Sequence, residues 1–144
     1  MLKNLDPLLT PELLRVLAAM GHGDVIAVAD ANFPAYSVAG DKPLIHLAGV
    51  DSLRTLQAIL SVLPLDTFDD EPVNTMQVVG DAQAEPEAVR RVREQLLARL
   101  DPVPAIRSIE RHAYYAEARQ AVAVVLTGET LPYGNFLLRK GVVF

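Results

Sequence analysis

The chain of 144 residues contains no cysteine. Disulfide bonds, thiol nucleophiles and metal sites with thiolate ligands are therefore excluded. No stretch approaches the roughly 20 apolar residues that a membrane-spanning helix requires. The N-terminal segment also lacks the apolar core of a signal peptide, because Asp6, Pro7 and Pro11 interrupt it. These absences predict a cytoplasmic protein that does not contact a membrane.

Basic clusters of the kind that bind nucleic-acid phosphates are missing as well. The formal net charge is −5. Arg90, Arg91 and Arg93 are interleaved with Glu87 and Glu94, which is typical of an exposed helix face with pairs of opposite charge. We therefore expect no nucleic-acid partner.

Common catalytic and metal-binding motifs are absent. The segment GHGDVI at residues 21–26 lacks the preceding strand that a glycine-rich phosphate loop needs. No serine lies in a nucleophile elbow. His22, His46 and His112 do not have the i,i+3 or i,i+4 spacing of a pair of metal ligands. The sequence therefore predicts neither a metal nor a cofactor.

Short apolar runs alternate with segments of helical pattern along the whole chain. The expected strands are Val25–Ala29, Leu44–Leu47, Val73–Val79, Ala105–Ile109, Val122–Leu126 and Phe136–Leu138. Helices are expected to begin at Thr10, at Asp51 or Ser52, and at His112, and a further helix is expected from about Glu85 to Leu100. Several of these strands are apolar throughout, which indicates burial on both faces. We predict one α/β domain over residues 1–144, with three layers and a mostly parallel or mixed sheet covered by helices on both faces.

Two titratable residues bracket the first expected strand. His22 lies between Gly21 and Gly23, where it is either an exposed loop residue or a general acid or base that a substrate can approach closely. Asp30 follows the strand directly. It either caps the next turn or contacts a ligand, because ligands of open α/β sheets bind beyond the carboxyl ends of strands.

A second group of polar candidates lies nearer the C-terminus. Tyr133, Gly134 and Asn135 form part of the segment PYGNFLL, and neutral donors and acceptors of this kind suit sugar hydroxyls, although they are also common in turns. Arg111 opens the expected short helix within the segment ERHAYYAEA, and the alternative for it is an ordinary exposed arginine. The residues alone indicate a neutral polar site with a histidine and an aspartate.

Four blocks of sequence resemble the fucose mutarotase and ribose pyranase family. They are PELLRVLAAMGHGD, DANFP, LTGE and PYGNFLLRKGVVF, in the order and at the spacing of that family, and the resemblance spans Leu8 to Phe144. It implies an isomerase that interconverts the cyclic forms of a free aldose without a cofactor. It also implies a homodecamer of two stacked pentameric rings.

Within the family the chain resembles the fucose branch, through Gly-His-Gly-Asp, Asp-Ala-Asn-Phe-Pro and Tyr-Gly-Asn. The segment YYAEA departs from that branch, because it lacks a Glu-Arg pair. The resemblance implies L-fucose as the substrate. Ribose or another aldose is the alternative substrate, and a non-catalytic sugar-binding accessory protein is the alternative class.

The resemblance also implies roles for individual residues. His22 corresponds to the family's proton donor, and the sugar contacts correspond to Asp30, Arg111 and Tyr133 through Asn135. An extended strand rises by about 3.3 Å per residue, so His22 and Asp30 are expected roughly 20 Å apart. Either the chain folds back before Ile26, or the two residues serve one site from different subunits; we favour the second arrangement.

Overall fold

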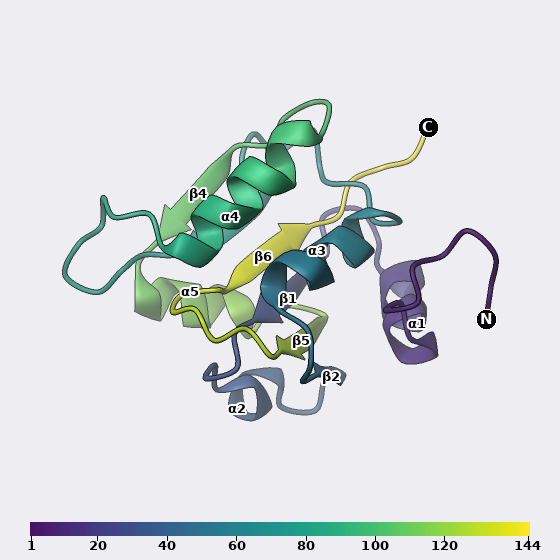
Figure 1. Cartoon of the computed structure of the whole chain (residues 1–144), viewed down its shortest axis with the longest axis horizontal. Helices are drawn as coiled ribbons and strands as arrows, with labels where there is room; N and C mark the ends of the chain where they lie inside the picture. The colour runs from purple at the N-terminus through teal and green to yellow at the C-terminus, as the bar shows by residue number, and fades with distance from the viewer.

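A mixed six-stranded sheet forms the centre of the computed structural model, which describes all 144 residues (Figure 1). Its strands are β1 (Val25–Ala29), β2 (Leu44–Leu47), β3 (Val73–Met76), β4 (Ile106–Ile109), β5 (Ala123–Thr127) and β6 (Phe136–Arg139). Their order across the sheet is β2-β5-β1-β6-β3-β4. All neighbouring strands pair in parallel except β6, which is antiparallel to both β1 and β3. The predicted α/β fold with a mixed sheet is confirmed.

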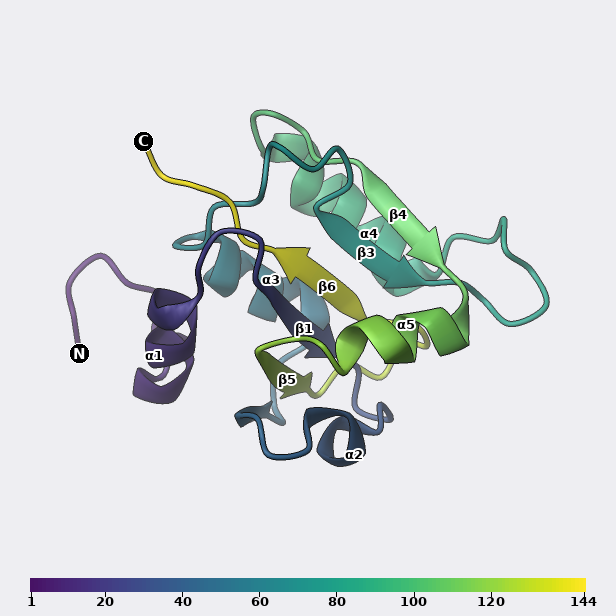
Figure 2. The same cartoon turned by 180° about the vertical axis from the view of Figure 1, so that it is seen from behind.

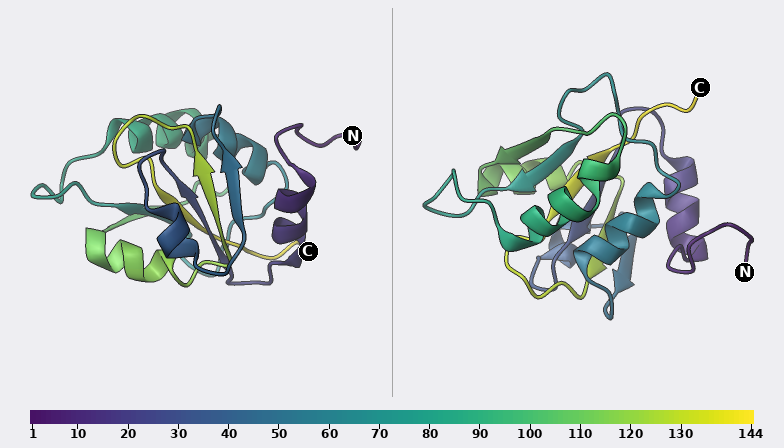
Figure 3. Two further views of the ribbon diagram at one scale, coloured as in Figure 1. Left: turned by 90° about the horizontal axis from the view of Figure 1, so that it is seen from below. Right: turned by 45° about the horizontal axis from the view of Figure 1, so that its top comes forward.

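Helices cover both faces of this sheet. They are α1 (Pro11–Ala19), α2 (Ala35–Ala39), α3 (Ser52–Leu60), α4 (Glu87–Gln95) and α5 (Arg111–Ala118), with a short 3₁₀ helix, η1 (Leu97–Arg99). Figure 2 shows α5 and α2 in front of the sheet, and α3 and α4 behind it. The view from below in Figure 3 shows the three layers edge-on.

Alternating side chains of β1 fill two separate cores. Ile26 and Val28 belong to a cluster of 21 buried residues beneath α1, α3 and α4. Ala27 and Ala29 face a cluster of 14 buried residues that includes residues of α2 and α5. Because both faces of the strand are buried, its sequence is apolar throughout rather than alternating.

Two predicted helix starts are confirmed by their capping bonds. The side chain of Thr10 accepts a hydrogen bond from the Leu13 amide at 3.2 Å, and Asp51 accepts one from the Arg54 amide at 2.8 Å. These bonds satisfy amides that have no partner within the helix. Ser52 is therefore the first residue of α3, and its own amide remains available to a group outside the helix.

The predicted helix from Glu85 to Leu100 is wrong as one continuous element. The chain leaves the helical conformation at Leu96, with φ −127° and ψ −63°, and continues as η1. This break turns Leu97 into the core, where it is 1% exposed. The helix α2 was not predicted, because five residues are too few to establish a helical period.

The strand predicted over Val73–Val79 ends three residues early, at Met76. Beyond it, the Val78 carbonyl accepts a hydrogen bond from the Asp81 amide within a turn, and the Val79 amide donates to the Tyr133 hydroxyl. Both groups therefore have partners outside the sheet. The early end of β3 thus leaves the segment after it free to bond to Tyr133, which precedes β6.

The direction of the strands brings several loops to one side of the sheet. The five parallel strands all end at this side, which we call the C-terminal edge, and antiparallel β6 begins there. Since β5 and β6 lie on either side of β1, the loop that joins them, residues 128–135, crosses the end of β1. The crossing therefore brings Tyr133, Gly134 and Asn135 close to Asp30, which follows β1.

Candidate functional site

Asp30 and Asn135 form a buried hydrogen-bonded pair at the C-terminal edge. The Asp30 amide donates to Asn135 Oδ1 at 2.9 Å, and Asn135 Nδ2 donates to Asp30 Oδ2 at 3.0 Å. The two residues are only 7% and 4% exposed. Residues that are 105 positions apart in the sequence are thus fixed against each other by a pair of reciprocal bonds.

Asp30 also caps the turn that follows β1. The interpretation of Asp30 as a turn cap, given as an alternative in the sequence analysis, therefore describes part of its role. Its Oδ1 atom accepts a hydrogen bond from the Asn32 amide at 3.0 Å. Burial raises the pKa of Asp30, and the hydrogen bonds from Asn32 and Asn135 offset that effect only in part. A partly desolvated carboxylate of this kind is a strong acceptor for hydroxyl groups.

Tyr133 and Gly134 belong to the same crossing loop. Tyr133 has a left-handed backbone with φ 61°, and its hydroxyl accepts a hydrogen bond from the Val79 amide at 3.1 Å. Gly134 is packed so tightly that a Cβ atom would lie 2.7 Å from Cγ of Glu129 and 3.3 Å from Oγ of Ser52. The conformation of this loop is therefore determined by contacts on both sides of it.

We expect Gly134→Ala to lower the free energy of unfolding by about 1–3 kcal/mol, because the added methyl group overlaps buried atoms. Thermal unfolding of the purified variant measures this loss. Gly49→Ala is the matched control, since a Cβ atom there meets nothing within 4 Å. Equal stability of the two variants would contradict the tight packing described for Gly134.

Arg111 lies farther along the C-terminal edge, at the start of α5. Its side chain is exposed and lines a recess of about 350 Å³ with residues 77–82, Glu110 and His112. The bond between Tyr133 and Val79 joins the wall of this recess to the crossing loop. Asp30, Tyr133, Gly134, Asn135 and Arg111 thus share one edge of the sheet, whereas Asp30 and Asn135 do not line the recess.

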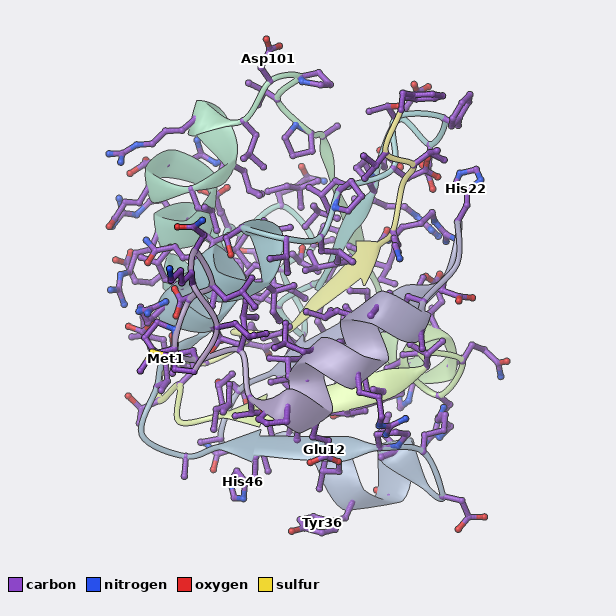
Figure 4. The ribbon with its side chains drawn as sticks, turned by 90° about the vertical axis from the view of Figure 1, so that its right-hand side faces the viewer. Met1, Glu12, His22, Tyr36, His46 and Asp101 are labelled. Carbon is purple, nitrogen blue, oxygen red and sulfur yellow. The ribbon has the colours of Figure 1, made fainter.

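His22 lies at the opposite edge of the sheet. It precedes the start of β1, where the Gly23 amide donates to the Lys140 carbonyl at 2.9 Å beyond the end of β6. Figure 4 shows His22 projecting from the loop after α1, well away from His46, which lies in the same row of the sheet as Ala29. The chain does not fold back before Ile26, and the extended segment from Asp24 to Asp30 separates the two edges by roughly 20 Å.

A partner of His22 that we did not predict is Asp66. The Nε2 atom of His22 lies 3.1 Å from Oδ1 of Asp66, whose side chain is 6% exposed. Burial alone would raise the pKa of Asp66, but hydrogen bonds from the Phe68 amide and from His22 outweigh it, so that this pKa is lowered. An ionised carboxylate can only accept, so His22 Nε2 is the donor and Nδ1 is left for another group.

Glu129 is the second residue that sequence reasoning missed. It is 3% exposed and lies at the base of the crossing loop. Its only sequence signal was its place in the block LTGE, to which no chemical role was attached. Asp66 gave even less signal, because it is one of several acidic residues in the segment 66–71.

None of the helices is both long and apolar enough to cross a membrane. Nowhere do three or more histidine, aspartate or glutamate side chains gather in an arrangement suited to a metal ion.

Residues 3–143 match the sequence model of the RbsD / FucU transport protein family. The chain is 44% identical to the human fucose mutarotase over 145 residues, which cover 99% of this chain and 94% of that protein. These two comparisons extend over nearly the full length of the chain.

Solved structures give a similar result. The fucose mutarotase of Streptococcus pneumoniae, solved in complex with L-fucose, is 37% identical and superposes with a TM-score of 0.88 over 99% of this chain and all of that one. RbsD of Bacillus subtilis, solved with D-ribose, is 26% identical and gives a TM-score of 0.74 over the whole of both chains. The fold thus resembles both structures, and it resembles the L-fucose complex more.

Proposed function

The chain belongs to the RbsD / FucU transport protein family, and we propose that it interconverts the anomers of free L-fucose by opening and closing the sugar ring. This is the function of a fucose mutarotase, an isomerase. The observation that supports it most is the buried Asp30–Asn135 pair, in a chain so similar to a protein that binds L-fucose.

The reaction requires two proton transfers and no change in oxidation state. Ring opening removes the proton of the anomeric hydroxyl and adds a proton to the ring oxygen, and closure on the other face reverses both transfers. A positioned acid or base contributes roughly 10²–10⁴-fold to such a step. Acid–base groups and hydroxyl-binding residues are therefore sufficient for the chemistry.

We assign sugar binding to the residues of the C-terminal edge. The raised pKa of Asp30 reflects a carboxylate with little solvent, which suits it to accept hydrogen bonds from sugar hydroxyls. Asn135 fixes its orientation, and Tyr133 and Gly134 form the adjacent wall. Arg111 lies in the neighbouring recess, where its guanidinium can donate to hydroxyl oxygens.

We assign proton donation to His22, with Asp66 orienting its ring. The bond from Nε2 to Asp66 fixes the orientation of the imidazole ring and leaves Nδ1 to face the sugar. The side chain of His22 is 49% exposed, which allows a ligand to reach it. Asp30 is a candidate for the complementary base.

A site that contains both His22 and Asp30 must be formed by two subunits, because one chain separates them by roughly 20 Å. The surface near His22 supports this arrangement. Phe68, which is 69% exposed, lies 5.4 Å from the His22 ring between ring centroids. Val103 and Val142 are also exposed, and they line a recess of about 490 Å³ that includes Asp66. Exposed apolar groups of this kind are typical of subunit interfaces.

We propose that this interface belongs to a homodecamer of two stacked pentameric rings in the cytoplasm. A cyclic ring uses two different surfaces of each subunit, so the His22 edge of one chain meets the C-terminal edge of the next. Native mass spectrometry measures the number of subunits directly. A stable monomer with full activity would exclude the shared site.

The alternatives are another aldose, with ribose first, and a sugar-binding protein without catalysis. Saturation-transfer NMR on equilibrated sugars distinguishes them, because it detects anomer exchange without a coupled enzyme. We expect accelerated exchange for L-fucose and little or none for D-ribose. Exchange with D-ribose alone would indicate the other branch, and binding of L-fucose without exchange would indicate the accessory protein.

We expect the rate of exchange to fall as the pH is lowered below neutral, because protonation of Asp30 weakens it as an acceptor for the sugar hydroxyls. Since burial raises the pKa of Asp30, this loss begins at a higher pH than for an ordinary aspartate, whose pKa is 3.8. The raised pKa of Asp30 also affects the free energy of unfolding. Its stabilising contribution is present at low pH, where the carboxyl group is protonated, and is lost as the pH rises through the pKa of Asp30 in the folded protein.

The measurement is saturation-transfer NMR on L-fucose at several pH values, with the spontaneous rate subtracted. A rate that does not fall at acidic pH would show that protonation of Asp30 plays no part in the mechanism.

A further inference from the structure

Glu129 is a buried carboxylate whose partners are neutral backbone amides. Its Oε1 atom accepts a hydrogen bond from the Leu131 amide at 2.8 Å, and its Oε2 atom accepts one from the Ser52 amide at 3.3 Å. A charged group that is 3% exposed is costly to bury. The cost of burying this carboxylate at the base of the crossing loop indicates that Glu129 has a specific role there.

We propose that Glu129 is a positioning residue for sugar binding, which fixes residues 129–135 so that Tyr133 and Asn135 face the substrate. This inference rests on the proposed function of the C-terminal edge. The carboxylate does not itself contact the sugar in this proposal. It acts indirectly, by fixing the conformation of the crossing loop.

Glu129 connects both ends of this loop. Its carbonyl accepts a hydrogen bond from the Ala31 amide at 2.9 Å, next to Asp30, and its amide donates to the Thr127 hydroxyl at 3.1 Å. At the other end of the loop, Gly134 packs so closely against Glu129 that a Cβ atom at position 134 would lie only 2.7 Å from Cγ of Glu129. The position of Asn135, which follows Gly134, therefore depends on where the Glu129 side chain lies.

Helix α3 provides a fixed support for the Glu129 carboxylate. The Ser52 amide lies at the N-terminus of α3, where the helix dipole favours a negative charge. The Ser52 hydroxyl donates to the Gly134 carbonyl at 2.9 Å. Ser52 is completely buried, so its amide and hydroxyl form two ties between the helix and the crossing loop.

A neutral amide cannot replace the Glu129 carboxylate. Glu129 accepts with both oxygens, whereas glutamine has one accepting oxygen and one donating nitrogen. In Glu129→Gln, either the Ser52 amide or the Leu131 amide then faces a second donor. The side chain has nearly the same volume, so the change affects hydrogen bonding more than packing.

We expect Glu129→Gln to raise the KM for L-fucose by about tenfold or more, because a buried hydrogen bond to a charged group corresponds to at least that factor. The fall in kcat should be smaller than the rise in KM, since His22 and Asp66 lie at the other edge. Ser52→Ala, which removes only the hydroxyl bond, should raise KM by a few-fold. Exchange rates across a range of fucose concentrations give both constants.

Asp51→Asn is the matched control. It neutralises a carboxylate at the same end of α3, but asparagine also caps helices well, and the Asp51 side chain bonds to the Arg54 amide rather than to the crossing loop. Its KM should equal that of the unchanged protein. Thermal unfolding of each variant checks that a changed KM does not come from loss of the fold.

An unchanged KM in folded Glu129→Gln would overturn the positioning role. Should that variant not fold, Ser52→Ala decides, and an unchanged KM there would overturn the proposal instead. If the proposed function itself were wrong, the result would differ, because the unchanged protein would then not accelerate the exchange of fucose anomers at all. In that case the Kd of each variant for L-fucose replaces KM as the test.

Discussion

Replacement of His22 by glutamine is expected to reduce the catalysed exchange of L-fucose anomers by about 10²–10⁴-fold, the contribution typical of one positioned acid or base. Glutamine retains a donor that can reach Asp66, but it cannot give up a proton to the ring oxygen of the sugar. His22 is half-exposed and belongs to neither core. The variant should therefore fold, and its melting temperature should change little.

His46→Gln serves as the matched control, because His46 is an exposed histidine on the edge strand β2. It should exchange fucose anomers at the rate of the unchanged protein. Exchange by His22→Gln at a comparable rate near neutral pH would remove the donor role, and His22 would then be an ordinary loop histidine.

The residues of the C-terminal edge could be predicted because their position follows from the strands. A residue directly after a buried parallel strand lies at the carboxyl edge wherever that strand stands in the sheet, and this places Asp30. The position of Asn135 required one further fact, namely that β6 runs antiparallel beside β1. The blocks of family sequence suggested that these residues act together, although local pattern alone did not.

Asp66 and Glu129 could not be predicted in the same way, because their significance depends on contacts between distant segments. Asp66 meets His22 across 44 positions, and Glu129 meets Ser52 across 77. Neither is distinguished by local composition from other acidic residues of the chain. The break at Leu96 was missed for a related reason, since burial of Leu97 depends on the packing of η1 rather than on helical propensity.

The second large effect is expected when two inactive proteins are combined. His22→Gln lacks the proposed proton donor, and Asp30→Asn lacks the carboxylate of the proposed sugar-binding edge. Each protein alone should show little exchange, since every site in its rings has one defect. The two proteins are dissociated, mixed in equal amounts and reassembled, and native mass spectrometry of mass-labelled subunits verifies that mixed rings have formed.

In those mixed rings activity should reappear. A site that takes His22 from one subunit and Asp30 from the next is intact when the first subunit is Asp30→Asn and the second is His22→Gln. Random assembly gives each condition a probability of one half, so about a quarter of the sites should be restored. Asp30→Asn reassembled with itself is the control and should remain inactive. If one chain supplied both residues, every site would keep a defect, and mixed rings without recovered exchange would therefore rule out the shared site.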